Sequence, residues 1–146
     1  MPQRNKLTVS ADLEEIRQIG VWIRSNVSRV LSEVDVDALM PTIELVVQEL
    51  AVNIVEHGYE ATGDERVDDE RIDVELATSK DKVELTVIDQ GRAYDPEAIA
   101  VPDIEDLQVS GYGVMIIKKL TSEFAVEHVG GRNISRLRFD VPTASE

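Results

Sequence analysis

Apolar residues recur at helical spacing in two long stretches early in the chain. The first stretch begins after Ser10 or Asp12, either of which can cap a helix, and runs to about Ser32. The second begins near residues 35–37 and ends near residues 56–58. The pattern predicts two amphipathic helices with the apolar stripes Leu13, Ile16, Ile19, Ile23, Val27 and Val30, and Leu39, Ile43, Val46, Val47, Leu50, Ile54 and Val55.

Alternation of apolar and polar residues predicts strands elsewhere. The polar turn at residues 79–81 and the pair Gly130-Gly131 each predict a hairpin, and a further helix is expected from about residue 111 to 121. Hairpins rather than crossovers join most strands. The order therefore predicts an α+β fold, a two-layer α/β sandwich whose mixed, mostly antiparallel sheet carries helices on one face. The expected strands are residues 6–10, 72–78, 82–89, 124–129 and 134–141.

Composition narrows the class of protein. The length of 146 residues fits one domain, which we expect to span residues 1–146. The net charge of −14 argues against a nucleic-acid-binding face, because phosphate contacts need clustered Lys and Arg. Without cysteine, disulfides and thiolate chemistry are excluded. No apolar run approaches the roughly 20 residues of a membrane span, so no membrane association and a cytoplasmic location are expected.

Polar residues on the second helix form the first candidate site. Glu49, Asn53 and His57 follow one another at intervals of four, so they share one helix face, which lies off the apolar stripe. A carboxylate beside a carboxamide can hold a proton acceptor next to a metal-bound phosphate, since Mg²⁺ prefers oxygen ligands and keeps several waters. Considered alone, the segment is explained as well by a solvated polar face.

Two glycine-containing segments add chemistry. In Asp89-Gln90-Gly91-Arg92-Ala93, an acid at a strand end can accept a hydrogen bond from an exocyclic amine such as that of adenine, and the glycine permits close approach to a planar ring. Residues 110–114 open a helix, where unpaired N–H groups and the helix dipole favour phosphate. Alone, each is explained by a turn or a hinge, and neither is a Walker A loop or a Rossmann fingerprint.

Together the three segments resemble the N, G1 and G2 boxes of GHKL ATPases, which share the Bergerat or histidine-kinase-like ATPase fold. The matching stretches are residues 49–59 (ELAVNIVEHGY), 89–96 (DQGRAYDP) and 110–117 (SGYGVMII). They are most similar to the anti-sigma-factor serine kinases of that superfamily. The resemblance extends from the first strand to Val141.

The resemblance implies a role for each matching residue. Glu49 would be the general base that accepts the proton of a serine hydroxyl, Asn53 would be a Mg²⁺ ligand, and Asp89 would bind adenine. Ser135, or alternatively Asn133, would support the adenine from the last strand. The rest of the ATP site would comprise His57, Gly91, Ala93, Ser110, Gly111, Tyr112, Gly113 and Val114.

The resemblance also implies partners. The chain would phosphorylate a STAS-type anti-anti-sigma protein with Mg-ATP and regulate a sigma factor by partner switching. Arg17 would contact a partner, and a homodimer would form near the first strand and helix.

Two alternatives remain open at this point. One is a regulatory module that binds ATP without transferring phosphate and sequesters a signalling protein; Val109 favours it, because some of these kinases carry Arg there, beside the phosphates. The other is a detached histidine-kinase catalytic domain, which neither His57 nor His128 supports, because neither is placed as the acceptor on a dimerising helix.

Overall fold

The computed structural model describes residues 2–55, 71–90 and 113–142, and these residues form three helices and five strands. None of the described helices is both long and apolar enough to cross a bilayer. In chain order the elements are β1 (Gln3–Ser10), α1 (Leu13–Val27), α2 (Glu33–Asn53), β2 (Arg71–Thr78), β3 (Lys82–Asp89), α3 (Gly113–Leu120), β4 (Glu123–Val129) and β5 (Arg132–Asp140).

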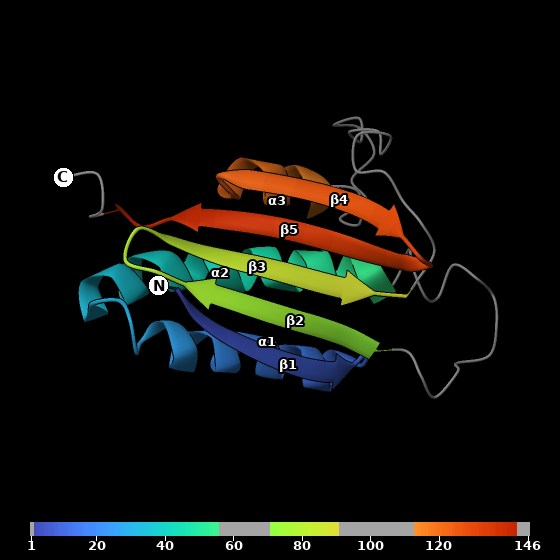
Figure 1. The fold of residues 1–146 in the computed structure, drawn as a ribbon, viewed down its shortest axis with the longest axis horizontal. Coiled ribbons are helices and arrows are strands. Elements are labelled where there is room, and N and C mark those ends of the chain that lie inside the picture. The colour runs from blue at the N-terminus through green and yellow to red at the C-terminus, as the bar shows by residue number, and fades with distance from the viewer. Residues whose placement is uncertain (1, 56–70, 91–112, 143–146) are drawn as a thin grey trace, which may run out of the picture.

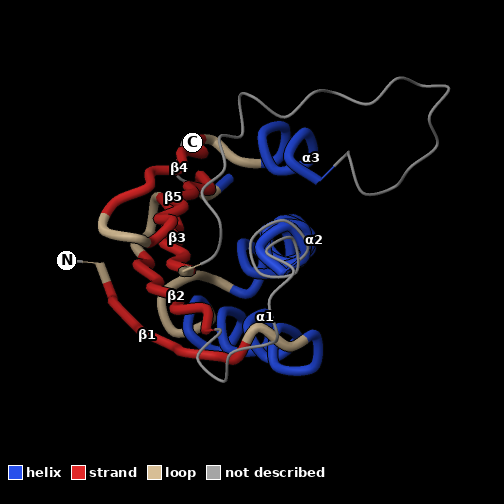
Figure 2. The backbone as a smooth tube through the Cα atoms, turned by 90° about the vertical axis from the view of Figure 1, so that its right-hand side faces the viewer, coloured by secondary structure: helices blue, strands red, loops and turns tan. Residues whose placement is uncertain are grey.

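The described strands form one sheet in the order β1-β2-β3-β5-β4, and every neighbouring pair is antiparallel (Figure 1). Seen along the sheet, α1, α2 and α3 all lie on the same side of it, with α2 between the other two (Figure 2). The two-layer α+β sandwich predicted from the sequence is therefore confirmed. The pairings among the described strands are antiparallel throughout, rather than mixed.

Both predicted hairpins are present. In the turn between β2 and β3, the Ser79 hydroxyl donates a 2.6 Å hydrogen bond to Asp81 Oδ1, which holds the pKa of that exposed carboxyl below its ordinary value. Between β4 and β5, Gly130 and Gly131 have φ of 60° and 76°. Side chains disfavour this left-handed region, so the glycine pair meets a backbone requirement of the turn.

Side-chain caps set the helix starts, and they correct two predicted boundaries. Asp12 caps α1 by accepting from the Glu14 amide at 2.8 Å. The first helix ends at Val27 instead of continuing to about Ser32, because the chain turns after Val27 and Ser32 caps α2 by accepting from the Asp35 amide. The second helix consequently begins at Glu33 and not at residues 35–37. Val30 continues the apolar spacing past Val27 and packs against the core, which concealed the end of the helix.

The core lies between the helix layer and the sheet. The predicted stripe of α2 is buried along its whole length, and Met40, Ile43 and Val46 are fully enclosed. These side chains meet the inward-facing residues of the middle strands, among them Leu85 and Leu137. The opposite face of the sheet is polar and carries cross-strand ion pairs such as Arg136–Glu127 at 3.0 Å. Only one face of the sheet is therefore available to a site built jointly by helices and strands.

Replacing Ser32 with Ala tests the cap that separates the two helices. The hydroxyl satisfies an amide in the first turn of α2, so we expect Ser32→Ala to lower the free energy of unfolding by about 1 kcal/mol, measured by urea titration. Ser25→Ala, at an exposed position inside α1, is the control and should leave stability within about 0.5 kcal/mol of wild type. Equal losses in the two variants would contradict the assigned boundary.

Candidate functional site

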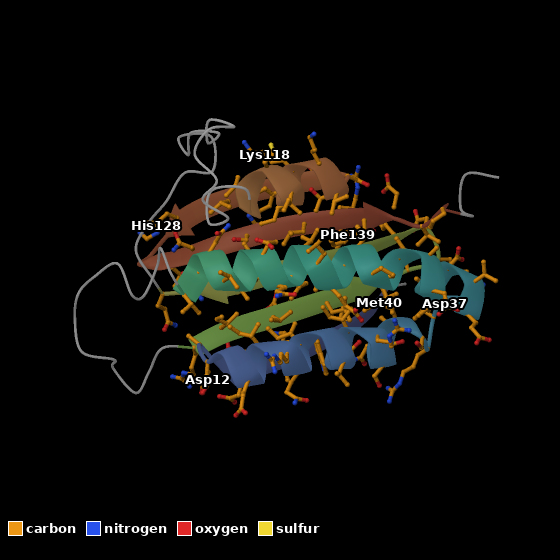
Figure 3. All side chains as sticks on the ribbon, turned by 180° about the vertical axis from the view of Figure 1, so that it is seen from behind. Asp12, Asp37, Met40, Lys118, His128 and Phe139 are labelled. Atoms are coloured by element: carbon orange, nitrogen blue, oxygen red, sulfur yellow. The ribbon has the colours of Figure 1, made fainter. Side chains whose placement is uncertain are left out.

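Five elements bring their ends together at one end of the molecule. In Figure 1 the C-terminal ends of α2, β3 and β4 and the N-terminal ends of α3 and β5 lie on the same side. Figure 3 shows His128 at this end, whereas Asp37, near the start of α2, lies at the opposite end. Glu49, Asn53, Asp89, Gly113 and Asn133 lie at or near these ends.

Glu49 and Asn53 on α2 lie directly against the first residue of α3. A Cβ at Gly113 would lie 3.0 Å from Glu49 Oε2 and 3.1 and 3.2 Å from Asn53 Nδ2 and Oδ1. Glu49 is half-buried and Asn53 is only 6% exposed. The polar face predicted on this helix is thus not a solvated surface, because α3 covers it. Two of the three sequence segments meet at this contact.

The buried carboxamide of Asn53 is incompletely hydrogen-bonded among the described residues. Its Nδ2 is buried and has no hydrogen-bond partner among the described residues. An amide kept from water without a partner costs free energy, so such a group in a native protein calls for an explanation. The first turn of α3 also carries N–H groups that have no acceptor within the helix. Oxygen atoms of a bound anion would satisfy both sets of donors.

Asp89, the last residue of β3, belongs to a second group of buried polar side chains. It is 1% exposed, and Asn133 Nδ2 on β5 donates a 3.0 Å hydrogen bond to its Oδ1. The strand register places Asp89 opposite Asn133 and Val87 opposite Ser135. Of the two residues that the sequence offered as support for adenine, Asn133 is therefore the one that contacts Asp89. Ser135 lies two residues after Asn133 on β5. Its Oγ is fully buried and has no hydrogen-bond partner among the described residues.

Sequence reasoning missed His128 as a member of this group. Its Nδ1 lies 3.0 Å from Asn133 Oδ1, and the β4–β5 register pairs the two residues directly. The alternation of β4, in which Phe124, Val126 and His128 share a face, was a signal that could have identified it.

The other predicted site residues divide into two groups. Val114, which follows Gly113, is buried in the first turn of α3. The remaining members of the predicted ATP site lie outside the described residues: His57, Gly91, Ala93, Ser110, Gly111 and Tyr112.

Arg17, the predicted partner contact, is exposed on α1. It lines a groove of about 540 Å³ between α1 and α2, together with Val21, Glu44 and Gln48. Arg24, on the same helix, forms ion pairs with Asp37 and Glu44 at 3.8 and 3.7 Å. The groove places an arginine beside apolar surface, and the role of Arg17 stays a prediction.

Comparison with known proteins defines the family. Residues 9–139 match the family described as "Histidine kinase-like ATPase domain". The chain therefore belongs to this family of GHKL-type ATP-binding domains. No curated protein sequence matches the chain.

A solved structure shares the fold. It is the crystal structure of the RsbU and RsbW domains of Rv1364c from Mycobacterium tuberculosis, with a TM-score of 0.63 and 20% sequence identity. The match covers 94% of this chain but only 31% of the other, so the chain spans about a third of that protein.

Gly113→Ala tests the contact between α2 and α3. Alanine favours a helix by about 1 kcal/mol over glycine, but its methyl group would displace Glu49 and Asn53 by a few tenths of an ångström. We expect ATP affinity to fall by about tenfold or more while the unfolding free energy changes by less than about 1 kcal/mol. Isothermal titration calorimetry and urea unfolding measure the two quantities.

The matched control for this experiment is Gly20→Ala. A Cβ there would meet Glu44 Cγ at 3.5 Å, an ordinary contact, inside α1. This variant should gain stability and bind ATP like wild type. Unchanged ATP affinity in Gly113→Ala would show that the close contact is irrelevant to the nucleotide.

Proposed function

We propose that the chain is a Mg-ATP-dependent protein-serine kinase of the anti-sigma type. The observation that carries the proposal is the meeting of Glu49, Asn53 and Gly113, which sets a carboxylate and a carboxamide against the N-terminus of α3. A proton acceptor, an oxygen ligand and anion-binding amides at one point are the groups that phosphoryl transfer requires. Family membership supports ATP binding, and the resemblance of the three boxes to those of anti-sigma-factor kinases supports the choice of serine.

Glu49 would act on the incoming hydroxyl. The serine oxygen would form a bond to the γ-phosphorus while the bond from that phosphorus to the ADP oxygen breaks, and the hydroxyl proton would pass to the Glu49 carboxylate. The half-buried position of Glu49 suits this task, because a carboxylate enclosed beside α3 keeps one orientation. Positioning and proton removal are the contributions that this residue would make.

Asn53 would hold the metal end of the nucleotide. Bound Mg²⁺ would neutralise charge on the β- and γ-phosphates. The Asn53 carboxamide fits a metal-bound phosphate, because Oδ1 can ligate Mg²⁺ and the buried Nδ2, which lacks an acceptor among the described residues, can donate to a phosphate oxygen. Asp89 would hold the base at the other end of the nucleotide, where its buried carboxylate can accept from an exocyclic amine.

A STAS-type anti-anti-sigma protein would be the phosphorylated partner, and a sigma factor would be released or bound in exchange. Arg17, exposed beside the groove between α1 and α2, would contact a partner, and a homodimer would form near β1 and α1. The chain would work in the cytoplasm as a single domain over residues 1–146. These assignments rest on the resemblance of the sequence motifs.

Binding of Mg-ATP is the first measurement. We expect calorimetry to detect binding by the wild type and at least about tenfold weaker binding by Asn53→Ala and by Asp89→Asn, which presents an amide donor to the amine of adenine. Asp73→Asn is the matched control, because Asp73 accepts its hydrogen bond from Thr8 on the outer face of the sheet and should not matter. No binding by folded wild type would overturn the proposal.

Glu49→Gln separates chemistry from binding. Without a proton acceptor, transfer of labelled γ-phosphate to a co-purified STAS-type protein should fall by about 100-fold or more, while the affinity for ATP stays near that of wild type. Glu84→Gln removes a carboxylate that pairs with Lys82 on β3 and should leave transfer intact. Stable partner binding with no transfer by the wild type would instead favour the non-catalytic ATP-binding module.

A further inference from the structure

A chain of hydrogen bonds crosses three neighbouring strands and ends on Asp89. His128 Nδ1 on β4 lies 3.0 Å from Asn133 Oδ1 on β5, and Asn133 Nδ2 lies 3.0 Å from Asp89 Oδ1 on β3. In the strand register, Asn133 on β5 lies directly opposite Asp89 on β3 and directly opposite His128 on β4. Asn133 is completely buried, whereas His128 reaches the surface.

The chemistry of Asp89 fixes the direction of every bond in this chain. A carboxylate oxygen only accepts, so the amide that faces it must present Nδ2. Asn133 Oδ1 then faces His128, and because this oxygen also only accepts, the imidazole must donate from Nδ1. The neutral ring is thereby held in the tautomer with its proton on Nδ1. A protonated ring would donate in the same direction.

We propose that His128 and Asn133 are positioning residues that orient the Asp89 carboxylate and thereby determine which base the site selects. The inference rests on the proposed function, in which Asp89 binds the base. A carboxylate in a fixed orientation accepts from the amine at position 6 of adenine. The same carboxylate opposes a base with a carbonyl at that position, because acceptor would face acceptor.

The position of Asn133 makes a role in orientation chemically reasonable. A buried carboxylate needs hydrogen-bond donors, and any donor would meet that need. An amide bound on both sides does more, since its plane is fixed by Asp89 at one end and by His128 at the other. His128 contributes from the surface strand β4, so its removal alters orientation without opening a cavity in the core.

The first test measures the protonation of His128 in the hydrogen-bond chain directly and needs no nucleotide. NMR of the imidazole nitrogens at alkaline pH distinguishes the two neutral tautomers, and His57→Gln assigns the signals because the chain has only 2 histidines. We expect His128 to carry its proton on Nδ1. A ring protonated on Nε2 would overturn the proposal.

The second test measures base selection. Calorimetry with Mg²⁺ compares ATP with purine riboside triphosphate, which lacks the exocyclic amine. In His128→Leu and Asn133→Leu we expect ATP affinity to fall by about tenfold and affinity for the analogue by less than about twofold. His128→Gln keeps an N–H donor and should restore much of the preference for ATP.

A control and two contrary outcomes complete this test. Glu127→Gln, on the outer face of the same strand, breaks the pair with Arg136 and should keep the wild-type preference. Equal losses for both nucleotides in the leucine variants would indicate a merely structural role and overturn the proposal. A wild type that binds neither nucleotide would overturn the proposed function, and with it the role in base selection. This would hold even if NMR confirms the hydrogen-bond chain from His128 to Asp89.

Discussion

Packing of the apolar stripe of α2 against the middle of the sheet is the interaction on which the site depends. The stripe is buried from Val36 to Leu50, so neither rotation nor sliding of the helix is possible without exposing core side chains. That constraint determines the direction in which every other residue of α2 faces. Glu49 and Asn53 accordingly face α3, and their closeness to Gly113 follows from this core packing.

Four of the seven buried polar residues in the described part of the chain lie at the end of the molecule that holds the proposed site, whereas Asn26, Asp35 and Thr78 are buried elsewhere. Asn53, Asp89, Asn133 and Ser135 are all at most 6% exposed and lie on elements whose ends meet there. Each such group lowers stability unless it is paired, so folding alone gives no reason to gather them. A binding site gives one, since a nucleotide supplies donors at its base and acceptors at its phosphates. The four buried polar residues at this end thus coincide with the proposed site.

Local sequence patterns predicted the helices and strands well, but they could not predict contacts between segments far apart in the sequence. The hairpins, the stripe of α2 and the sandwich follow from spacing and turn residues, which are local properties. The end of α1 was misplaced because Val30, which also packs against the core, continues the apolar period past Val27. The pairing of Asp89 with Asn133 joins residues 44 positions apart, and strand register sets it. Sequence spacing carries no such information, so it favoured Ser135 and could not show that Asn133 is hydrogen-bonded to Asp89.

The two halves of the proposed site are supported by different kinds of structure. The phosphate end would depend on the close contact between two helices, α2 and α3. The base end depends on β3, β5 and β4, which are tied by continuous backbone ladders. A sheet resists displacement more than a helix contact does, because several backbone hydrogen bonds must break together. In the proposed site, base recognition would thus rest on the sheet, while the reacting phosphate would be held at the contact between the two helices.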